Sequence, residues 1–231
     1  MNNKKEDQKL IWDHFQAGNK QAFLSALPRY NFLINQVKNK TKQASKVLNV
    51  GIGLGFIERQ LLSEAFEVYS LDPSENIVKE QKKYGIKAEI GFIENQPFKD
   101  NFFDVIILSE VIEHIPLTKL NNAIEESYRV LKPGGYVFVT VPFNEILEEN
   151  EVICPNCGDK FHRWGHYSSF DKNKLNLLFS TKFKVQKIKV LAFTEWKLDL
   201  YGLVKNITKF LLGKLGKAIT SPRIYLLAKK Q

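Results

Sequence analysis

Short apolar runs and helical repeats alternate along most of the chain. Runs typical of buried strands occupy residues 46–50, 67–71, 87–91, 104–108, 135–141, 182–193 and 223–228. Apolar residues recur at helical spacing between them, over residues 55–64, 74–83, 117–131 and 171–179. Because strands that alternate with helices build a parallel sheet covered on both faces, the pattern predicts a doubly wound α/β fold over residues 46–231.

The residues before the first predicted strand have a different pattern. Two helical segments are separated by Pro28, and each places apolar or aromatic side chains on one face. These side chains are Leu10, His14 and Ala17 in the first segment and Phe32, Ile34 and Val37 in the second. The pattern predicts an N-terminal helical cap over residues 1–45.

Three alternate glycines follow the first predicted strand. Gly51, Gly53 and Gly55 allow a tight turn in which backbone amides approach a ligand, where a Cβ would collide. Asp72 ends the next apolar run, where a carboxylate can accept hydrogen bonds from both ribose hydroxyls. In the dinucleotide pattern the third glycine comes one residue later, where this chain has Phe56, and no phosphate-binding Gly-Lys-Ser/Thr follows. The spacing favours a nucleoside ligand without phosphate.

Four motifs in order resemble those of the class I S-adenosylmethionine-dependent methyltransferases. The strand and glycines of residues 46–56 are similar to the first motif, and Asp72 to the second. Residues 91–115 resemble the adenine loop, fourth strand and active-site turn, and residues 129–142 the Pro-Gly-Gly turn and fifth strand. The resemblance implies a Rossmann-like sheet of seven strands, mostly parallel, in which the last strand is antiparallel. It also implies that the protein is an enzyme with S-adenosylmethionine as its cofactor.

The resemblance assigns cofactor contacts to residues of four strand ends. The backbone of Gly51 and Gly53 passes along the methionine and ribose groups, and a helix beginning near Gly55 points its dipole at the cofactor carboxylate. Asp72 accepts from the ribose diol, and Ser109 contacts the methionine part.

At two positions the chain departs from the family pattern. Asn49 replaces an acidic residue before the glycines but still offers an acceptor oxygen. Phe92 stands where many relatives have an acidic residue, so the backbone of Ile93 and an apolar sandwich become the expected adenine contacts.

Glu110, Glu113 and His114 follow the fourth predicted strand within one helical turn. Similar residues in O-methyltransferases of the ubiquinone pathway have been associated with a metal. Three roles therefore stay open: binding of a divalent cation, deprotonation or orientation of the acceptor by His114, and a structural cap. An in-line acceptor held close to the sulfonium supplies most of the rate in any of these cases.

A second group of candidate ligands lies in an insertion at residues 150–168. Cys154, Cys157, His162 and His166 offer four zinc ligands within thirteen residues, and Pro155 favours a tight knuckle. The sequence predicts a structural zinc site, with a redox-active dithiol as the alternative. His166 is also a candidate to face the substrate.

Charge and composition restrict the partners. The net charge of +9 favours anionic partners, and two cysteines in 231 residues indicate a reducing, cytoplasmic compartment. Residues 198–219 read as a basic amphipathic helix that either covers the sheet or lies on an anionic membrane surface. We therefore expect methyl transfer to an oxygen of a small or lipid-linked acceptor, with peripheral membrane contact. The sequence does not predict the oligomeric state.

The same motifs leave two alternatives to methyl transfer to a small acceptor. The first is a non-catalytic, zinc-stabilised interaction module that keeps a nucleoside pocket. The second is a nucleic-acid methyltransferase, which the basic charge suggests. The sequence Ser109-Glu-Val-Ile stands where an amino-methylating enzyme carries Asp/Asn/Ser-Pro-Pro-aromatic, which argues against nucleic acid as the substrate.

Overall fold

A computed structural model describes residues 25–193 and 222–231. The strands are β1 (Lys46–Val50), β2 (Glu67–Asp72), β3 (Lys87–Ile90), β4 (Phe103–Ser109), β5 (Leu131–Pro142), β6 (Glu151–Ile153), β7 (Lys160–His162), β8 (Lys184–Leu191) and β9 (Arg223–Lys229). The α-helices are α3 (Leu27–Lys40), α4 (Phe56–Ser63), α5 (Glu75–Lys82), α6 (Leu117–Val130) and α7 (Lys172–Ser180), with short 3₁₀ helices η1 (Ile112–His114) and η2 (Leu147–Asn150).

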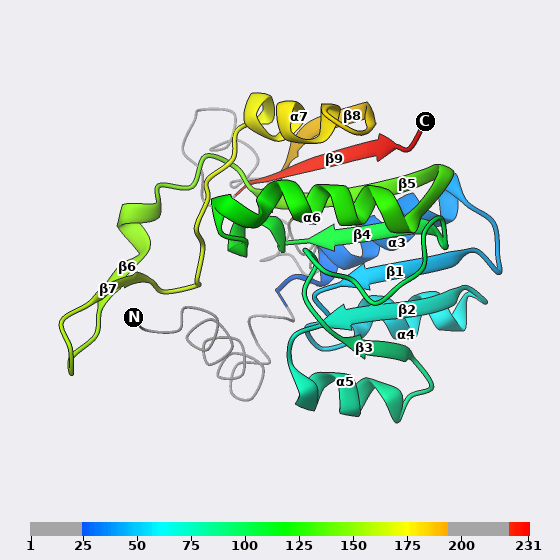
Figure 1. Ribbon diagram of the computed structural model, residues 1–231, viewed down its shortest axis with the longest axis horizontal. Helices are drawn as coiled ribbons and strands as arrows, with labels where there is room; N and C mark the ends of the chain where they lie inside the picture. Colours follow the sequence, from blue (N-terminus) through cyan, green and yellow to red (C-terminus); the bar gives the residue numbers. More distant parts are fainter. Residues whose placement is uncertain (1–24, 194–221) are drawn as a thin grey trace, which may run out of the picture.

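The main sheet has seven strands in the order β3-β2-β1-β4-β5-β9-β8 (Figure 1). Neighbouring strands from β3 to β5 pair parallel, whereas β9 pairs antiparallel with both β5 and β8. The predicted doubly wound sheet with an antiparallel last strand is therefore confirmed. Its carboxyl edge carries the glycine turn, Asp72 and the residues after β4.

Helices cover both faces of the sheet because alternate strand residues point to opposite faces. On one face, Leu48 and Ile106 pack with apolar residues of α6 and α7. On the other face, Val47 and Ile107 pack with residues of α3 and α4. A third, smaller cluster seats α5 against the β3 edge.

Helix α3 belongs to the core of this sheet. Leu33, Ile34 and Val37 are buried in the cluster that also contains residues of β1, β4 and β9. Pro28 lies in its first turn, where a missing backbone N–H costs no hydrogen bond. The segment with Leu10, His14 and Ala17 lies outside the described residues, so the predicted cap over residues 1–45 stays a prediction.

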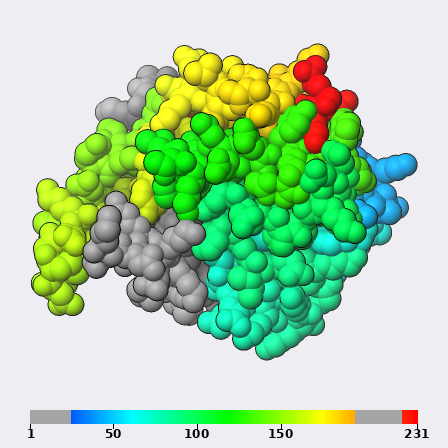
Figure 2. Space-filling model, viewed as in Figure 1, coloured from blue at the N-terminus to red at the C-terminus, as the bar shows by residue number. Residues whose placement is uncertain are grey.

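A small hairpin of β6 and β7 projects from the main domain between β5 and α7 (Figures 1 and 2). It contains the two cysteines in and near its turn, within the insertion predicted from the sequence. Among the described residues, no helix is both long and apolar enough to cross a lipid bilayer. The predicted basic helix at 198–219 lies outside the residues that the structure describes.

Candidate active site

The glycine turn after β1 closes tightly over the end of β2. Gly51 and Gly55 both have a left-handed φ, of 78° and 68°, which a residue with a Cβ rarely adopts. A Cβ on Gly55 would also lie 2.0 Å from Oε1 of Gln81 on α5. The turn therefore requires glycine for its conformation and for the close approach of α5.

Asp72 is buried at the end of β2, beside this turn. Its two carboxylate oxygens accept hydrogen bonds from the backbone amides of Ile52, at 2.9 Å, and Ser74, at 2.8 Å. A carboxylate has about four acceptor positions, so binding two backbone amides is compatible with a role as a ribose acceptor. The backbone thus fixes the orientation of the acid that the sequence assigned to the ribose.

Asn49 faces a buried carboxyl group on α4. Its Nδ2 donates to Oε1 of Glu58 at 2.7 Å, and Ser70 Oγ donates to the same oxygen at 3.0 Å. Burial raises the pKa of Glu58 from its ordinary value near 4.5 to about 7, although both hydrogen bonds act in the opposite direction. Asn49 Nδ2 also lies 3.4 Å from the carbonyl oxygen of Gly51, so the same side chain contacts both α4 and the glycine turn.

The loop after β3 holds the two predicted adenine residues. Ile93 is buried, whereas Phe92 is 39% exposed and is not a core residue. Gly91 N donates to the carbonyl oxygen of Asp72 at 3.1 Å, which brings the start of this loop next to the ribose carboxylate.

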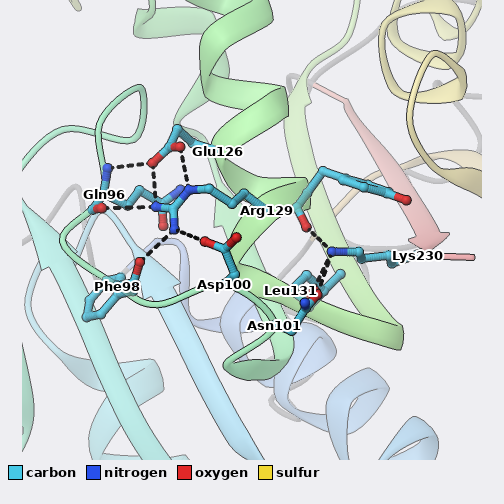
Figure 3. Close-up of polar contacts among 9 residues, drawn as sticks. Gln96, Phe98, Asp100, Asn101, Glu126, Arg129, Leu131 and Lys230 are labelled. Atoms are coloured by element: carbon cyan, nitrogen blue, oxygen red, sulfur yellow. Dashed lines mark hydrogen bonds and ion pairs between the residues drawn. The ribbon is translucent and has the colours of Figure 1, made fainter.

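Arg129 of α6 holds the rest of this loop in place (Figure 3). Its guanidinium donates to the backbone oxygens of Gln96 and Phe98 and to the carboxylates of Asp100 and Glu126. Next to it, the Lys230 ammonium donates to the side chain of Asn101 and to the backbone oxygens of Tyr128 and Leu131. These contacts fix the 91–102 loop, and through it Ile93, against α6.

At the end of β4, two arginines from distant parts of the chain meet Glu110. Its Oε2 lies 2.5 Å from Nε of Arg223 on β9 and 3.6 Å from Nη1 of Arg29 on α3. Arg29 Nε also donates to Ser109 Oγ at 3.1 Å. Glu110 has a left-handed φ of 57°, a strained conformation for a residue other than glycine. Both arginine contacts are made by Oε2, whereas Oε1 of Glu110 is buried without a hydrogen-bond partner among the described residues.

Glu113 and His114 lie in η1, directly after this group. Glu113 is fully buried, and neither of its carboxylate oxygens has a hydrogen-bond partner within residues 25–193 and 222–231. Burial, followed by the nearby charge of Glu110, raises the pKa of Glu113 well above its usual range. Burial also lowers the pKa of His114 well below its usual value, so this imidazole is neutral at neutral pH.

The segment after the hairpin joins η1 through its backbone. Tyr167 N and Ser168 N both donate to the carbonyl oxygen of Glu113, at 2.8 and 3.2 Å. His114 Nδ1 lies 3.2 Å from the carbonyl oxygen of Gly165 and therefore donates to it. The ring centroids of His114 and His166 are 4.5 Å apart as a result.

His162 and His166 belong to this cluster together with Glu145. His166 Nδ1 lies 2.5 Å from Oε2 of Glu145, and His162 Nε2 lies 3.6 Å from Oε1 of the same carboxylate. The two imidazole rings stack with centroids 4.6 Å apart.

The structure does not bring the four predicted zinc ligands together. Cys154 and Cys157 lie at the tip of the hairpin, and Cys157 is exposed. Backbone amides of Asn156 and Cys157 lower the pKa of the Cys154 thiol, and Gly158 N closes the turn on the carbonyl oxygen of Cys154 at 2.9 Å. In the described residues, each group of three or more candidate metal ligands consists of histidines and glutamates only. The predicted knuckle turn is therefore formed, but the histidines face Glu145 and η1 instead.

Comparisons with known proteins agree with this geometry. Residues 48–139, which hold the glycine turn, Asp72 and β4, match the family model described as a methyltransferase domain. This part of the chain is therefore similar in sequence to methyltransferases, and the sheet has the fold of solved methyltransferase structures.

Relatives of several methyltransferase types match the chain. The ubiquinone biosynthesis O-methyltransferase of Rickettsia prowazekii is 28% identical over 229 residues, covering 85% of this chain and 86% of that protein. Phosphoethanolamine N-methyltransferase 2 of Caenorhabditis elegans is 32% identical over 43% of this chain, which spans only 24% of that protein's length. A chain from the complex of the Haloferax volcanii Trm112 methyltransferase activator with a methyltransferase superposes with a TM-score of 0.72, at 16% identity and 96% coverage of each chain.

Sequence reasoning missed the residues that support the site. Glu58 and Glu145 lie in ordinary polar positions along the chain, and nothing in their spacing shows that one meets Asn49 and the other His166. Arg29 and Arg223 are separated from Glu110 by 81 and 113 residues. Only Glu58 could have been noticed in the sequence, because this acidic residue stands between Ile57 and Leu61 on the apolar side of α4.

Proposed function

We propose that the protein transfers a methyl group from S-adenosylmethionine to an oxygen of a small or lipid-linked acceptor. The proposal rests on the cluster of Glu113, His114 and His166, which lies next to the glycine turn that follows β1. A Cβ on Gly51 would lie 3.0 Å from the Val111 side chain, so the loop and the start of η1 are in contact. The R. prowazekii relative, of which the match covers 86%, is named as an O-methyltransferase of ubiquinone biosynthesis, whereas relatives named as N- and C-methyltransferases match shorter parts of this chain. This longer match supports oxygen as the accepting atom.

In this proposal the cofactor lies along the carboxyl edge of β1, β2 and β4. The backbone of Gly51 and Gly53 and the amino end of α4 at Gly55 take its methionine end, and Asp72 takes the ribose diol. Ile93 contacts adenine from the loop that Arg129 holds. Ser109 contacts the methionine group while its Oγ accepts from Arg29.

His114 is the residue proposed to take the acceptor proton. Its Nδ1 donates to the Gly165 carbonyl, so Nε2 is the nitrogen that carries the lone pair. A neutral imidazole is the form that can accept a proton, and burial lowers the pKa of His114 toward that form. Glu110, held by Arg223, orients the turn rather than reacting.

Calorimetry and a labelled cofactor test the proposal. S-adenosylmethionine should bind at about one per chain, and Asp72→Ala should weaken it by about 1.5–3 kcal/mol, the usual worth of a hydrogen bond to a charged group. Methyl-labelled cofactor incubated with metabolite and lipid extracts should then label a hydroxyl-bearing acceptor, and His114→Gln should slow that transfer without weakening cofactor binding. Binding of NAD instead, or labelling of nitrogen alone, would refute the proposal.

A lipid-linked acceptor would place the enzyme at the cytoplasmic surface of a membrane. The basic residues at 198–219 are proposed to dock there, and their charge suits anionic lipids. Co-sedimentation with anionic vesicles that fades as salt rises would support this contact. No pelleting at low salt would leave a water-soluble acceptor.

A structural zinc ion is proposed for the cysteine knuckle. Its support is the turn itself, in which Cys154 and Cys157 share a thiol hydrogen bond and backbone amides point at the Cys154 sulfur. Two thiolates supply half of a tetrahedral site, so further ligands must come from elsewhere.

A further inference from the structure

We infer that a cavity at the amino edge of the main sheet is a second ligand site, for a small molecule that carries several phosphate groups. The cavity has a volume of about 540 Å³, and small-molecule sites in proteins typically have about 300–1,000 Å³. It lies between the end of α3, the start of β4 and the turn at the start of β5. The parallel strands run from this edge toward the glycine turn, so the cavity lies at the opposite edge from the proposed cofactor site (Figure 1).

Positive charge predominates among the described residues that line the cavity. Lys40 and Lys42 come from the end of α3 and the turn after it, and Lys132 comes from β5. Asp104 is the carboxylate among them. Its Oδ1 accepts from Lys132 Nζ at 2.7 Å and its Oδ2 from the backbone amide of Lys46 at 2.8 Å. Three lysines and one carboxylate leave a surplus of two positive charges.

This surplus comes from Lys40 and Lys42, which have no carboxylate partner among residues 25–193 and 222–231. Lys40 Nζ lies 5.8 Å from the centre of the Tyr136 ring, and Lys229 Nζ lies 5.6 Å from the same centre. A cation–π contact holds an ammonium group near a ring and leaves its charge in place. The negative end of the α3 dipole accounts for a lysine in the last turn of that helix, but Lys132 and Lys229 come from other elements.

Hydrogen-bond donors also exceed free acceptors in the cavity. Both carboxylate oxygens of Asp104 already accept a hydrogen bond. The ammonium groups of Lys40 and Lys42 and the amide of Asn39 supply donors. A matching ligand must therefore bring acceptor oxygens and more than one negative charge. Phosphate groups have both properties, and lysine binds them as a point charge. A ligand with several phosphates matches the surplus of charge better than a single carboxylate does.

The cavity is separate from the site of methyl transfer. Helix α3 connects the two, because Arg29 near its start contacts Ser109 and Glu110, and Lys40 at its end lines the cavity. A helix of 14 residues spans roughly 20 Å. A small ligand in the cavity therefore does not contact the methyl donor, and the inference does not rest on the proposed function.

Calorimetry with inorganic triphosphate on the full chain at low ionic strength tests the site. Triphosphate should bind at one per chain, and saturating S-adenosylmethionine should not change its affinity. The double variant Lys40→Gln/Lys42→Gln should weaken binding roughly tenfold, about the combined worth of two exposed ion pairs. The matched control is Lys83→Gln/Lys172→Gln, which removes two exposed lysines outside the cavity and should keep the parent's affinity. Circular dichroism checks that both variants fold.

Two further probes identify the source of the phosphate groups. Tighter binding of adenosine triphosphate than of triphosphate supports the site with a nucleotide as its ligand, and tighter binding of inositol trisphosphate supports it with a lipid headgroup.

Three results would overturn the inference. The first is no saturable binding of triphosphate at low ionic strength. The second is an equal loss of affinity in the two double variants, which would mean attraction to the general surface charge. The third is competition with S-adenosylmethionine, which would put the phosphates at the glycine turn. Because no methyl transfer is measured, each of these results leaves the proposed function standing.

Discussion

Deprotonation of Glu58 should make the stability of this protein fall as the pH rises from acid to neutral. The pKa of the folded protein's Glu58 is about 7, against about 4.5 when the group is in water. Between these values the folded state binds one proton more than the unfolded state, so the free energy of unfolding decreases with pH. At about 1.4 kcal/mol per pH unit, the loss across this window is about 3 kcal/mol.

This loss of free energy of unfolding is a large fraction of the total for a typical domain, about 5–15 kcal/mol. Glu58→Gln should remove this dependence, because the amide keeps the acceptor for Asn49 Nδ2 and Ser70 Oγ and replaces the acid O–H with an N–H donor. At pH 8 the variant should therefore be more stable than the parent by up to about 3 kcal/mol, and at pH 4.5 the two should be nearly equal.

Urea unfolding followed by circular dichroism, from pH 4.5 to 8, measures this difference. Glu80→Gln on α5 is the matched control, because Glu80 is exposed and its variant should keep the parent's pH profile. If Glu58→Gln were less stable than the parent at pH 8, the folded protein would stabilise the ionised Glu58 carboxylate, and the inference that burial raises its pKa would be wrong.

Three further predictions concern the turn, the loop and the hairpin. Gly55→Ala should destabilise the protein more than Gly85→Ala in urea unfolding: both glycines have a left-handed φ, worth roughly 1–2 kcal/mol, but only position 55 meets Gln81. Equal losses would contradict the close contact. Arg129→Lys should lower thermal stability by about 1.5 kcal/mol and weaken cofactor binding, because an ammonium cannot reproduce the bidentate contacts; unchanged cofactor affinity would mean that the loop is held by other contacts. Cys157→Ser should remove about one zinc per chain in metal analysis, whereas a zinc-free protein with an easily formed disulfide would favour the redox role.

Much of the fold could be predicted from local patterns. The seven predicted strands fell on the seven strands of the main sheet. Central strands such as β1 and β4 are apolar because both of their faces are buried, whereas β3 and β8 at the ends of the sheet order are largely exposed and mix apolar with polar residues. The helical repeat predicts a helix over residues 117–131, but α6 ends at Val130 and β5 begins at Leu131, which pairs with Phe103. Pairing with β4 set that boundary, and no local signal reports it.

The site was less predictable because its support comes from distant residues. The positions of Asp72 and of the glycines at 51, 53 and 55 could be predicted from the sequence, because a strand end and a tight turn determine them locally. Cysteines and histidines that lie close in the sequence predicted one zinc site for Cys154 and His162. The hairpin separates the two residues, because the thiols lie at its tip and the histidine lies at its base. Proximity along the chain is a poor guide once a hairpin intervenes.

The place of β9 between β5 and β8 has a consequence for synthesis on the ribosome. β8 is made before β9, and within residues 25–193 and 222–231 β9 is the strand that pairs with it. Until residues 223–229 emerge, β5 and β8 both lack the partner that β9 gives them in the described residues, and open strand edges attract other chains. The nascent protein therefore passes through a stage in which its first five strands can form while Glu110 still lacks Arg223. Chaperone contact is expected at that stage, and a pause in translation before residue 223 should increase aggregation.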